Sequence, residues 1–353
     1  MFRQKTLLIL GAGASYELGL PTGNALKQEI SEILKVHPER DHLMDLQPRH
    51  DKITDALNHV VRHGTADGST FKKAELLYAC SRISASIPLA RSIDNYLHSN
   101  KDSKAIELCG KLGIAYTILQ AEADCLLKTE KAAAPFQVDF SALKDSWYSR
   151  FGSLLFESSF DDMKEALKNL TVIVFNYDRC FEHFLYHAII TYYGREPNEA
   201  ADVVKNMAIY HPYGMVGHLP WTGEPLTAEF GEKAEGGKLV QLAGNIKTYT
   251  EGVDRRSSEI QAIHEAIRQA TTVVFLGFGF IGLNMDLLLA DDGETMNTNK
   301  TVYLTSKGIS DPDMRRVWKR ITEQLWNPGM EVGDQWTCVE LFDQNTFSLG
   351  ESL

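Results

Sequence analysis

The stretch "TLLILGAGASYELGLPTGNAL", Thr6 to Leu26, decides the fold class. The apolar run Thr6–Leu10 ends at a glycine, which is typical of a buried parallel strand. Gly11 and Gly13 then allow a sharp turn from strand to helix, and such a turn aims backbone N–H groups at an anion. Two glycines alone fit an ordinary strand-to-helix turn equally well, so the segment leaves a dinucleotide site and a plain turn open.

The turn departs from the nicotinamide-dehydrogenase fingerprint. The third glycine of G-x-G-x-x-G would fall at Tyr16, and no acidic residue ends a second strand about 20 residues on, because Glu32 lies in a helical pattern. Thr22 follows in "GLPTG", where it can cap the next helix.

Apolar strand patterns return in the second half of the chain and alternate with helical segments such as Phe181–Tyr193 and Ser258–Gln269. This alternation predicts an α/β fold, a Rossmann-like doubly wound parallel sheet with helices on both faces. The predicted later strands are Thr171–Phe175, Ala208–Tyr210, Leu239–Leu242, Thr272–Leu276, Thr301–Leu304 and Cys338–Phe342.

Residues 36–134 differ in texture, with long helical stretches such as Lys104–Leu127 and few β-branched clusters. We interpret them as a helical insertion or cap that leaves by a linker near residues 130–140. The expected nucleotide-binding domain therefore comprises residues 1–35 and 135–353.

Composition narrows the function classes. The 353 residues carry a net charge of −11 without a dense Lys/Arg run, which argues against direct nucleic-acid binding. The N-terminal apolar run is too short for a signal peptide or membrane span, so we expect a cytoplasmic protein with no membrane contact. Five scattered cysteines encode neither a disulfide framework nor a zinc ribbon, and we expect no metal.

Polar residues gather where predicted strands end. Asn176 and Asp178 follow one strand, at the position where open α/β sheets bind ligands, although both residue types also cap helices. His211 follows the next strand, and imidazole can act as a base near neutral pH, although a solitary histidine is more often structural. Gly277 and Gly279 end a third strand and allow close approach of a ligand, or simply a tight turn.

Two histidine pairs, His59/His63 and His183/His187, have the i,i+4 spacing of metal ligands. No HExxH glutamate or third ligand accompanies them. We assign both pairs to helix surfaces and aromatic packing.

Taken in order, "LILGAGAS…GLPTG", "VFNYD…FE", "IYHPYGMVGHL" and "FLGFGFIGLNMD" resemble the SIR2-like (sirtuin-related) domain, most closely its bacterial antiphage-defence branch. These motifs cover about a third of the chain. The resemblance implies an NAD+ hydrolase that cleaves NAD+ to nicotinamide and ADP-ribose, as a defence effector that depletes cellular NAD+. It further implies that the chain forms a homo-oligomer, and that oligomerisation or a partner such as a HerA-type ATPase or a short Argonaute activates it.

The resemblance also implies roles for individual residues. Asn176 matches the asparagine that orients the nicotinamide ribose or the attacking water, Asp178 the acidic residue that contacts the carboxamide, and His211 the catalytic histidine. The implied NAD+-binding residues are Gly11, Ala12, Gly13, Ser15, Thr22, Gly277 and Gly279.

Departures from the family pattern keep alternatives open. The four-cysteine zinc module of sirtuin deacylases is absent, and Thr22-Gly23-Asn24 replaces their Asp-Phe-Arg. The usual His-Gly pair appears as His211-Pro212-Tyr213-Gly214, so His218 is a second candidate for the base. A protein deacylase or ADP-ribosyltransferase, and a non-catalytic subunit that binds NAD+ or ADP-ribose, remain alternatives to the hydrolase.

Overall fold

The computed structural model describes residues 3–38, 46–129, 138–252, 257–288, 300–324, 329–333 and 335–352. Its centre is a six-stranded sheet in the order β5-β4-β1-β6-β7-β8, and every neighbouring pair is parallel. The strands of this sheet are β1 (Thr6–Leu10), β4 (Leu170–Val174), β5 (Ala208–Tyr210), β6 (Thr272–Leu276), β7 (Thr301–Leu304) and β8 (Gly329–Val332).

The strand order runs outward from β1 in both directions along the sheet. In chain order the six strands lie as 3-2-1-4-5-6, which is the order of dinucleotide-binding α/β sheets. The protein is therefore an α/β protein with a Rossmann-like parallel sheet. The order reverses between β1 and β6, so the end of this strand pair is where such sheets bind ligands.

Alternating strand residues build one hydrophobic core on each face of the sheet. Leu7 and Ile9 of β1 belong to one core, whereas Leu8 and Leu10 belong to the other. This happens because successive side chains of a strand point to opposite faces, and a parallel sheet buried on both faces needs apolar residues at every position.

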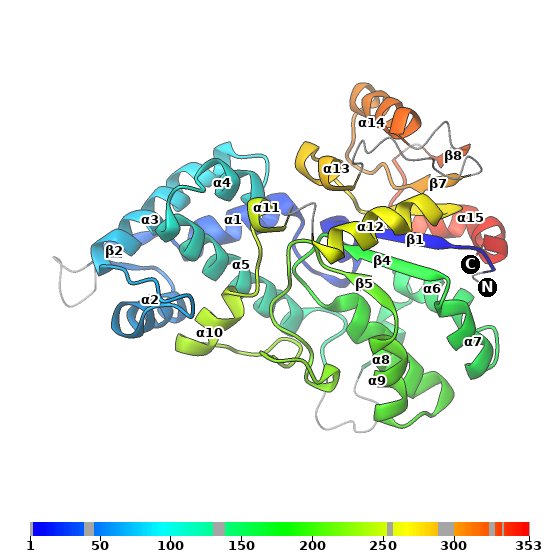
Figure 1. The fold of residues 1–353 in the computed structure, drawn as a ribbon, viewed down its shortest axis with the longest axis horizontal. Helices are drawn as coiled ribbons and strands as arrows, with labels where there is room; N and C mark the ends of the chain where they lie inside the picture. Colours follow the sequence, from blue (N-terminus) through cyan, green and yellow to red (C-terminus); the bar gives the residue numbers. More distant parts are fainter. Residues whose placement is uncertain are drawn as a thin grey trace.

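Helices cover both faces of the sheet (Figure 1). Those of the first half of the chain are α1 (Gly23–Ile33), α2 (Asp51–His63), α3 (Lys73–Ser86), α4 (Ile93–Ser99), α5 (Lys104–Asp124), α6 (Trp147–Leu155) and α7 (Phe160–Leu167). Those of the second half are α8 (Cys180–Tyr193), α9 (Pro197–Lys205), α10 (Gly236–Ala243), α11 (Tyr249–Gly252), α12 (Ser258–Gln269), α13 (Gly282–Leu288), α14 (Asp311–Gln324) and α15 (Cys338–Ser352). Short 3-10 turns are η1 (Ala12–Ala14), η2 (Tyr16–Leu18), η3 (Ile87–Leu89), η5 (Phe140–Leu143) and η6 (Pro220–Thr222).

Helices α1–α5, α10 and α11 lie together beside the sheet, and we call them the helical lobe (Figure 1). Helix α10 packs against α2 and α5, and α11 packs against α4. A two-stranded antiparallel hairpin, β2 (Val36–Pro38) with β3 (Leu46–Pro48), adjoins it. The described part of residues 36–134 is thus mostly helical apart from this hairpin, and α1, α10 and α11 join it from outside that range. Of the expected linker, residues 130–137 lie outside the described residues.

Two predicted strands are wrong. Leu239–Leu242 lies in helix α10, and Cys338–Phe342 opens helix α15. Both runs are short and apolar because each helix buries one face. From an apolar run of this length alone, a strand cannot be distinguished from a buried helical turn. The hairpin strands and β8 were not predicted from the sequence.

The five cysteines are unpaired and buried, as expected of small core residues. None of the helices in the described ranges combines the length and apolar character needed to cross a bilayer.

Candidate functional site

The glycine turns after β1 and β6 pack directly against each other. The Gly11 N–H donates to the Leu276 carbonyl and the Gly13 N–H to the Gly277 carbonyl, both at 2.9 Å. A Cβ at Gly11 or Gly13 would meet the backbone of this second turn at 2.5 to 2.7 Å. Turn-to-turn packing therefore accounts for the glycines, and their two amides are already occupied.

The Asn176 and Asp178 side chains lie against the first glycine turn. Asn176 Nδ2 donates to the Gly11 carbonyl at 3.0 Å and to Ser15 Oγ at 3.2 Å. The Ser15 hydroxyl donates to Asp178 Oδ2 at 3.0 Å. The other oxygen of Asp178 accepts the Cys180 N–H at 3.0 Å, so Asp178 satisfies the first N–H of α8 although the N-cap residue itself is Arg179.

His211 joins this group from the end of β5. Its Nε2 lies 2.6 Å from Glu182 Oε1, and the His211 side chain is 5% exposed and that of Glu182 12% exposed. Glu182 stands in the first turn of α8, one turn beyond Asp178. We call Ser15, Asn176, Asp178, Glu182 and His211 the edge cluster, because they follow the carboxyl ends of the neighbouring strands β1, β4 and β5.

Burial and charge set the ionisation of the edge cluster. Burial raises the pKa of Asp178 above its ordinary value, although the Cys180 N–H opposes the shift. Burial alone would lower the pKa of His211, but the Glu182 carboxylate outweighs it and the net shift is upward. Burial alone would raise the pKa of Glu182, but His211 outweighs it and the net shift is downward. The two groups therefore favour an imidazolium–carboxylate pair.

Two atoms of this pair have no hydrogen-bond partner. Within the described residues, His211 Nδ1 and Glu182 Oε2 belong to a set of four unpartnered buried side-chain atoms, completed by Thr117 Oγ1 and Arg195 Nε. A buried polar atom without a partner costs free energy, so its presence in a site needs an explanation. Two of the four occur in one residue pair of the edge cluster.

The residues flanking Asp178 are held by the helical lobe. The Tyr177 hydroxyl donates to Asp94 of α4. Arg179 and Glu122 of α5 form an ion pair with both side chains fully buried, and Arg179 Nε lies 3.1 Å from Glu122 Oε1. The guanidinium also donates to the Ala228 carbonyl at 2.6 Å. The lobe therefore fixes the backbone that carries Asn176 and Asp178.

Among the described residues, the structure gives the remaining candidate residues no side-chain hydrogen bond to the edge cluster. Ala12 begins the 3-10 turn η1, and Thr22 occupies the N-cap of α1 without a side-chain capping bond. Gly279 is exposed and lies two residues beyond Gly277. His218 is half-buried, which lowers its pKa, and it lies within electrostatic range of His211.

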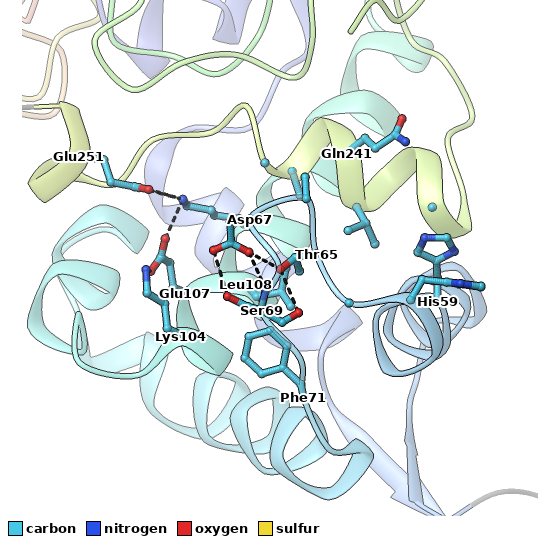
Figure 2. A pocket seen from close by; sticks show the side chains of 18 residues that line it. His59, Thr65, Asp67, Ser69, Phe71, Lys104, Glu107, Leu108, Gln241 and Glu251 are labelled. Atoms are coloured by element: carbon cyan, nitrogen blue, oxygen red, sulfur yellow. Dashed lines mark hydrogen bonds and ion pairs between the residues drawn. The ribbon is translucent and has the colours of Figure 1, made fainter.

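A cavity of about 440 Å³ lies elsewhere, inside the helical lobe (Figure 2). Its walls come from α2, the following loop, α5, α10 and α11. The Asp67 carboxylate there accepts hydrogen bonds from Thr65 and Ser69. Lys111 bridges the carboxylates of Glu107 and Glu251, each at 2.8 Å. The charges of this cavity are thus largely satisfied by each other.

The histidine pairs behave as helix-packing residues. His59 and His63 line the lobe cavity with ring centroids 4.6 Å apart. His183 stacks on Phe230 at 3.9 Å and is buried. In the described part of the chain, no group of three or more His, Cys, Asp or Glu side chains is arranged to hold a metal ion.

Sequence reasoning missed Glu182, Asp94 and Glu122. Glu182 stands inside the quoted motif "VFNYD…FE", so the pattern contained it without giving it a role. Asp94 and Glu122 reach the site from 83 and 57 residues away, and no local pattern indicates such contacts.

No protein-family model matches the chain, and no curated protein matches it.

Proposed function

We propose that the protein is an NAD+ hydrolase of the SIR2-like type, with the edge cluster as its active site. The observation that carries the proposal is the convergence of three distant motifs. Ser15, Asn176 and His211 follow three neighbouring strands and meet beside the point where the strand order reverses. Open α/β sheets bind their ligands at this place.

The reaction breaks the C1′–N bond between ribose and nicotinamide. Nicotinamide leaves as a neutral amide, water supplies the new C1′ hydroxyl, and one proton is released to a base. Because the leaving group is already cationic, no acid is needed, and stabilisation of the oxocarbenium-like transition state dominates. In this scheme Asn176 positions the water or ribose hydroxyl, Asp178 holds the carboxamide and His211 accepts the proton.

The structure supports His211 rather than His218 as the base. His211 is buried against the Asn176–Asp178 segment and carries an unpartnered ring nitrogen, whereas His218 is half-buried.

The glycine turn after β1 offers less to NAD+ than the sequence suggested. The amides of Gly11 and Gly13 bind the neighbouring turn, so NAD+ would use other groups at this edge for its pyrophosphate.

The test is nicotinamide release from NAD+ by the purified chain at high protein concentration, which favours the homo-oligomer that the family resemblance implies. We expect release by the wild type, and loss of release in Asn176→Ala and His211→Ala with folding intact by circular dichroism. His63→Ala, in the lobe cavity, is the matched histidine control and should keep the wild-type rate.

Other outcomes identify the alternatives. Wild-type rates in Asn176→Ala or His211→Ala would remove that residue from the mechanism. Turnover of acyl-lysine peptide, or ADP-ribose attached to protein, would favour a deacylase or transferase. NAD+ binding by calorimetry without nicotinamide release, even at high concentration, would favour a binding subunit.

A further inference from the structure

The His211–Glu182 pair distinguishes the two ring nitrogens of the histidine. Nε2 lies 2.6 Å from a carboxylate oxygen, whereas Nδ1 of the buried ring makes no hydrogen bond of normal geometry. The backbone of Asn176 lies near enough to the ring to contribute to the raised pKa of His211. Glu182 is held in place by the first turn of α8, and His211 by the segment that leaves β5. The Gly214 N–H donates to the His211 carbonyl at 2.8 Å, which closes that segment into a turn.

The chemistry of the two side chains fixes which nitrogen carries hydrogen. An ionised carboxylate only accepts hydrogen bonds, so Nε2 must donate to it. A neutral imidazole has one N–H, and the hydrogen bond made by one nitrogen sets the state of the other. With hydrogen held on Nε2, the lone pair of the neutral ring stands on Nδ1. Any proton that His211 accepts then binds at Nδ1.

We propose that Glu182 is a positioning residue that holds His211 in the Nε2–H tautomer and thereby makes Nδ1 the proton-accepting atom of the edge cluster. The part of this inference that concerns the tautomer stands on the geometry alone. The part that concerns turnover rests on the proposed NAD+ hydrolysis.

The charged groups around the ring come from several elements. Glu182 and Asp178 face it from the segment after β4, and His218 from the loop after β5. The Arg179 charge contributes to the lowered pKa of Glu182. Both carboxylates raise the pKa of His211, so Nδ1 becomes available as a base only as the pH rises through that pKa. Hydrolysis should accordingly increase with pH along an acid limb.

The decisive measurement is the state of each ring nitrogen by long-range ¹H–¹⁵N correlation NMR on the full chain. His211 is assigned by the signal that disappears in His211→Gln. Above the pKa of His211, we expect Nε2 to be protonated and Nδ1 unprotonated. An Nδ1–H tautomer in the wild type would overturn the inference, and this measurement requires neither a Glu182 variant nor enzymatic activity.

Two substitutions at Glu182 separate charge from hydrogen bonding. A glutamine side chain still offers an amide oxygen to Nε2, so Glu182→Gln should keep the tautomer and move the acid limb of kcat to lower pH. Glu182→Leu removes the acceptor, so a mixture of tautomers is expected. It should lower kcat by about 10²-fold, because a positioned proton acceptor contributes ~10²–10⁴-fold, and leave KM unchanged.

A matched control is Glu165→Gln, which changes an exposed carboxylate of α7 that pairs with Lys168. It should change neither the tautomer nor the pH profile. If Glu182→Leu retained a pure Nε2–H tautomer, Glu182 would not be the residue that sets it. If no variant or wild type released nicotinamide while the tautomers behaved as expected, the proposed function would fall and the role of Glu182 in holding the ring would remain.

Discussion

The edge cluster and the lobe cavity differ in how they satisfy their polar groups. In the cavity, Lys111 bridges two carboxylates and Asp67 is bonded by its own loop. In the edge cluster, His211 and Glu182 are buried and each keeps one unpartnered atom. A cavity supplies space, but unpartnered buried atoms cost free energy and indicate function more strongly. We therefore assign the proposed chemistry to the sheet edge and not to the lobe cavity.

The largest difference in the free energy of unfolding is expected between substitutions of two glutamates. Glu122→Gln leaves the buried Arg179 guanidinium without its counterion and should destabilise the protein by about 3–5 kcal/mol. Glu251→Gln, at a lobe-cavity carboxylate whose side chain is 46% exposed, should cost about 1 kcal/mol or less. Urea unfolding followed by circular dichroism measures both, and equal losses would remove the contrast between the two regions.

The next largest loss of stability is expected from a substitution in the packed glycine turns at the sheet edge. Gly277 has a φ of +56°, and a Cβ there would meet Ala14 N at 2.0 Å. Gly277→Ala should cost about 2–3 kcal/mol through overpacking and backbone strain. Gly279→Ala is the matched control, since its Cβ meets nothing closer than 3.7 Å. A Gly277→Ala protein as stable as the control would show that the two turns can separate freely.

A smaller and pH-dependent effect is expected for Glu182→Gln. The pKa of His211 is raised by folding from its ordinary value of 6.5, so the protonated ring stabilises the folded state fully below pH 6.5. This stabilisation is lost as the pH rises through the pKa of the folded protein. The pKa of Glu182 is lowered by folding from its ordinary value of 4.5, so the ionised carboxylate stabilises the folded state fully above pH 4.5. This stabilisation is lost as the pH falls through the pKa of the folded protein. The stability gap between wild type and variant should therefore peak between pH 4.5 and 6.5, at about 1–3 kcal/mol. A gap independent of pH in urea titrations would contradict the ion pair.

The smallest effect is expected at the rim of the lobe cavity. Lys104 pairs with Glu107 and its side chain is 67% exposed. Lys104→Ala should change the free energy of unfolding by no more than about 0.5 kcal/mol. It should also leave nicotinamide release unchanged, and a loss of release with intact folding would show that the cavity takes part in the reaction.

Sequence patterns predicted the sheet better than the site. The bounds of β1, β5, β6 and β7 were predicted correctly, and β4 was misplaced by one residue, because buried parallel strands are uniformly apolar runs between turn signals. Leu239–Leu242 has the same local appearance, but α2 and α5 pack against it as a helix. Strand ends indicated Asn176 and Asp178 as site residues, and the family resemblance added Ser15. The role of Glu182 could not be predicted, because it depends on where the fold places His211.

The two contacts from the helical lobe to Tyr177 and Arg179 have a consequence for protein engineering. A shortened protein that lacks residues 36–134 would lose Asp94 and Glu122 together. The Arg179 guanidinium would then lose the carboxylate that pairs with it in the intact protein. The sheet with its edge cluster is consequently not separable from the helical lobe, and a deletion of residues 36–134 needs apolar replacements at Tyr177 and Arg179 to fold.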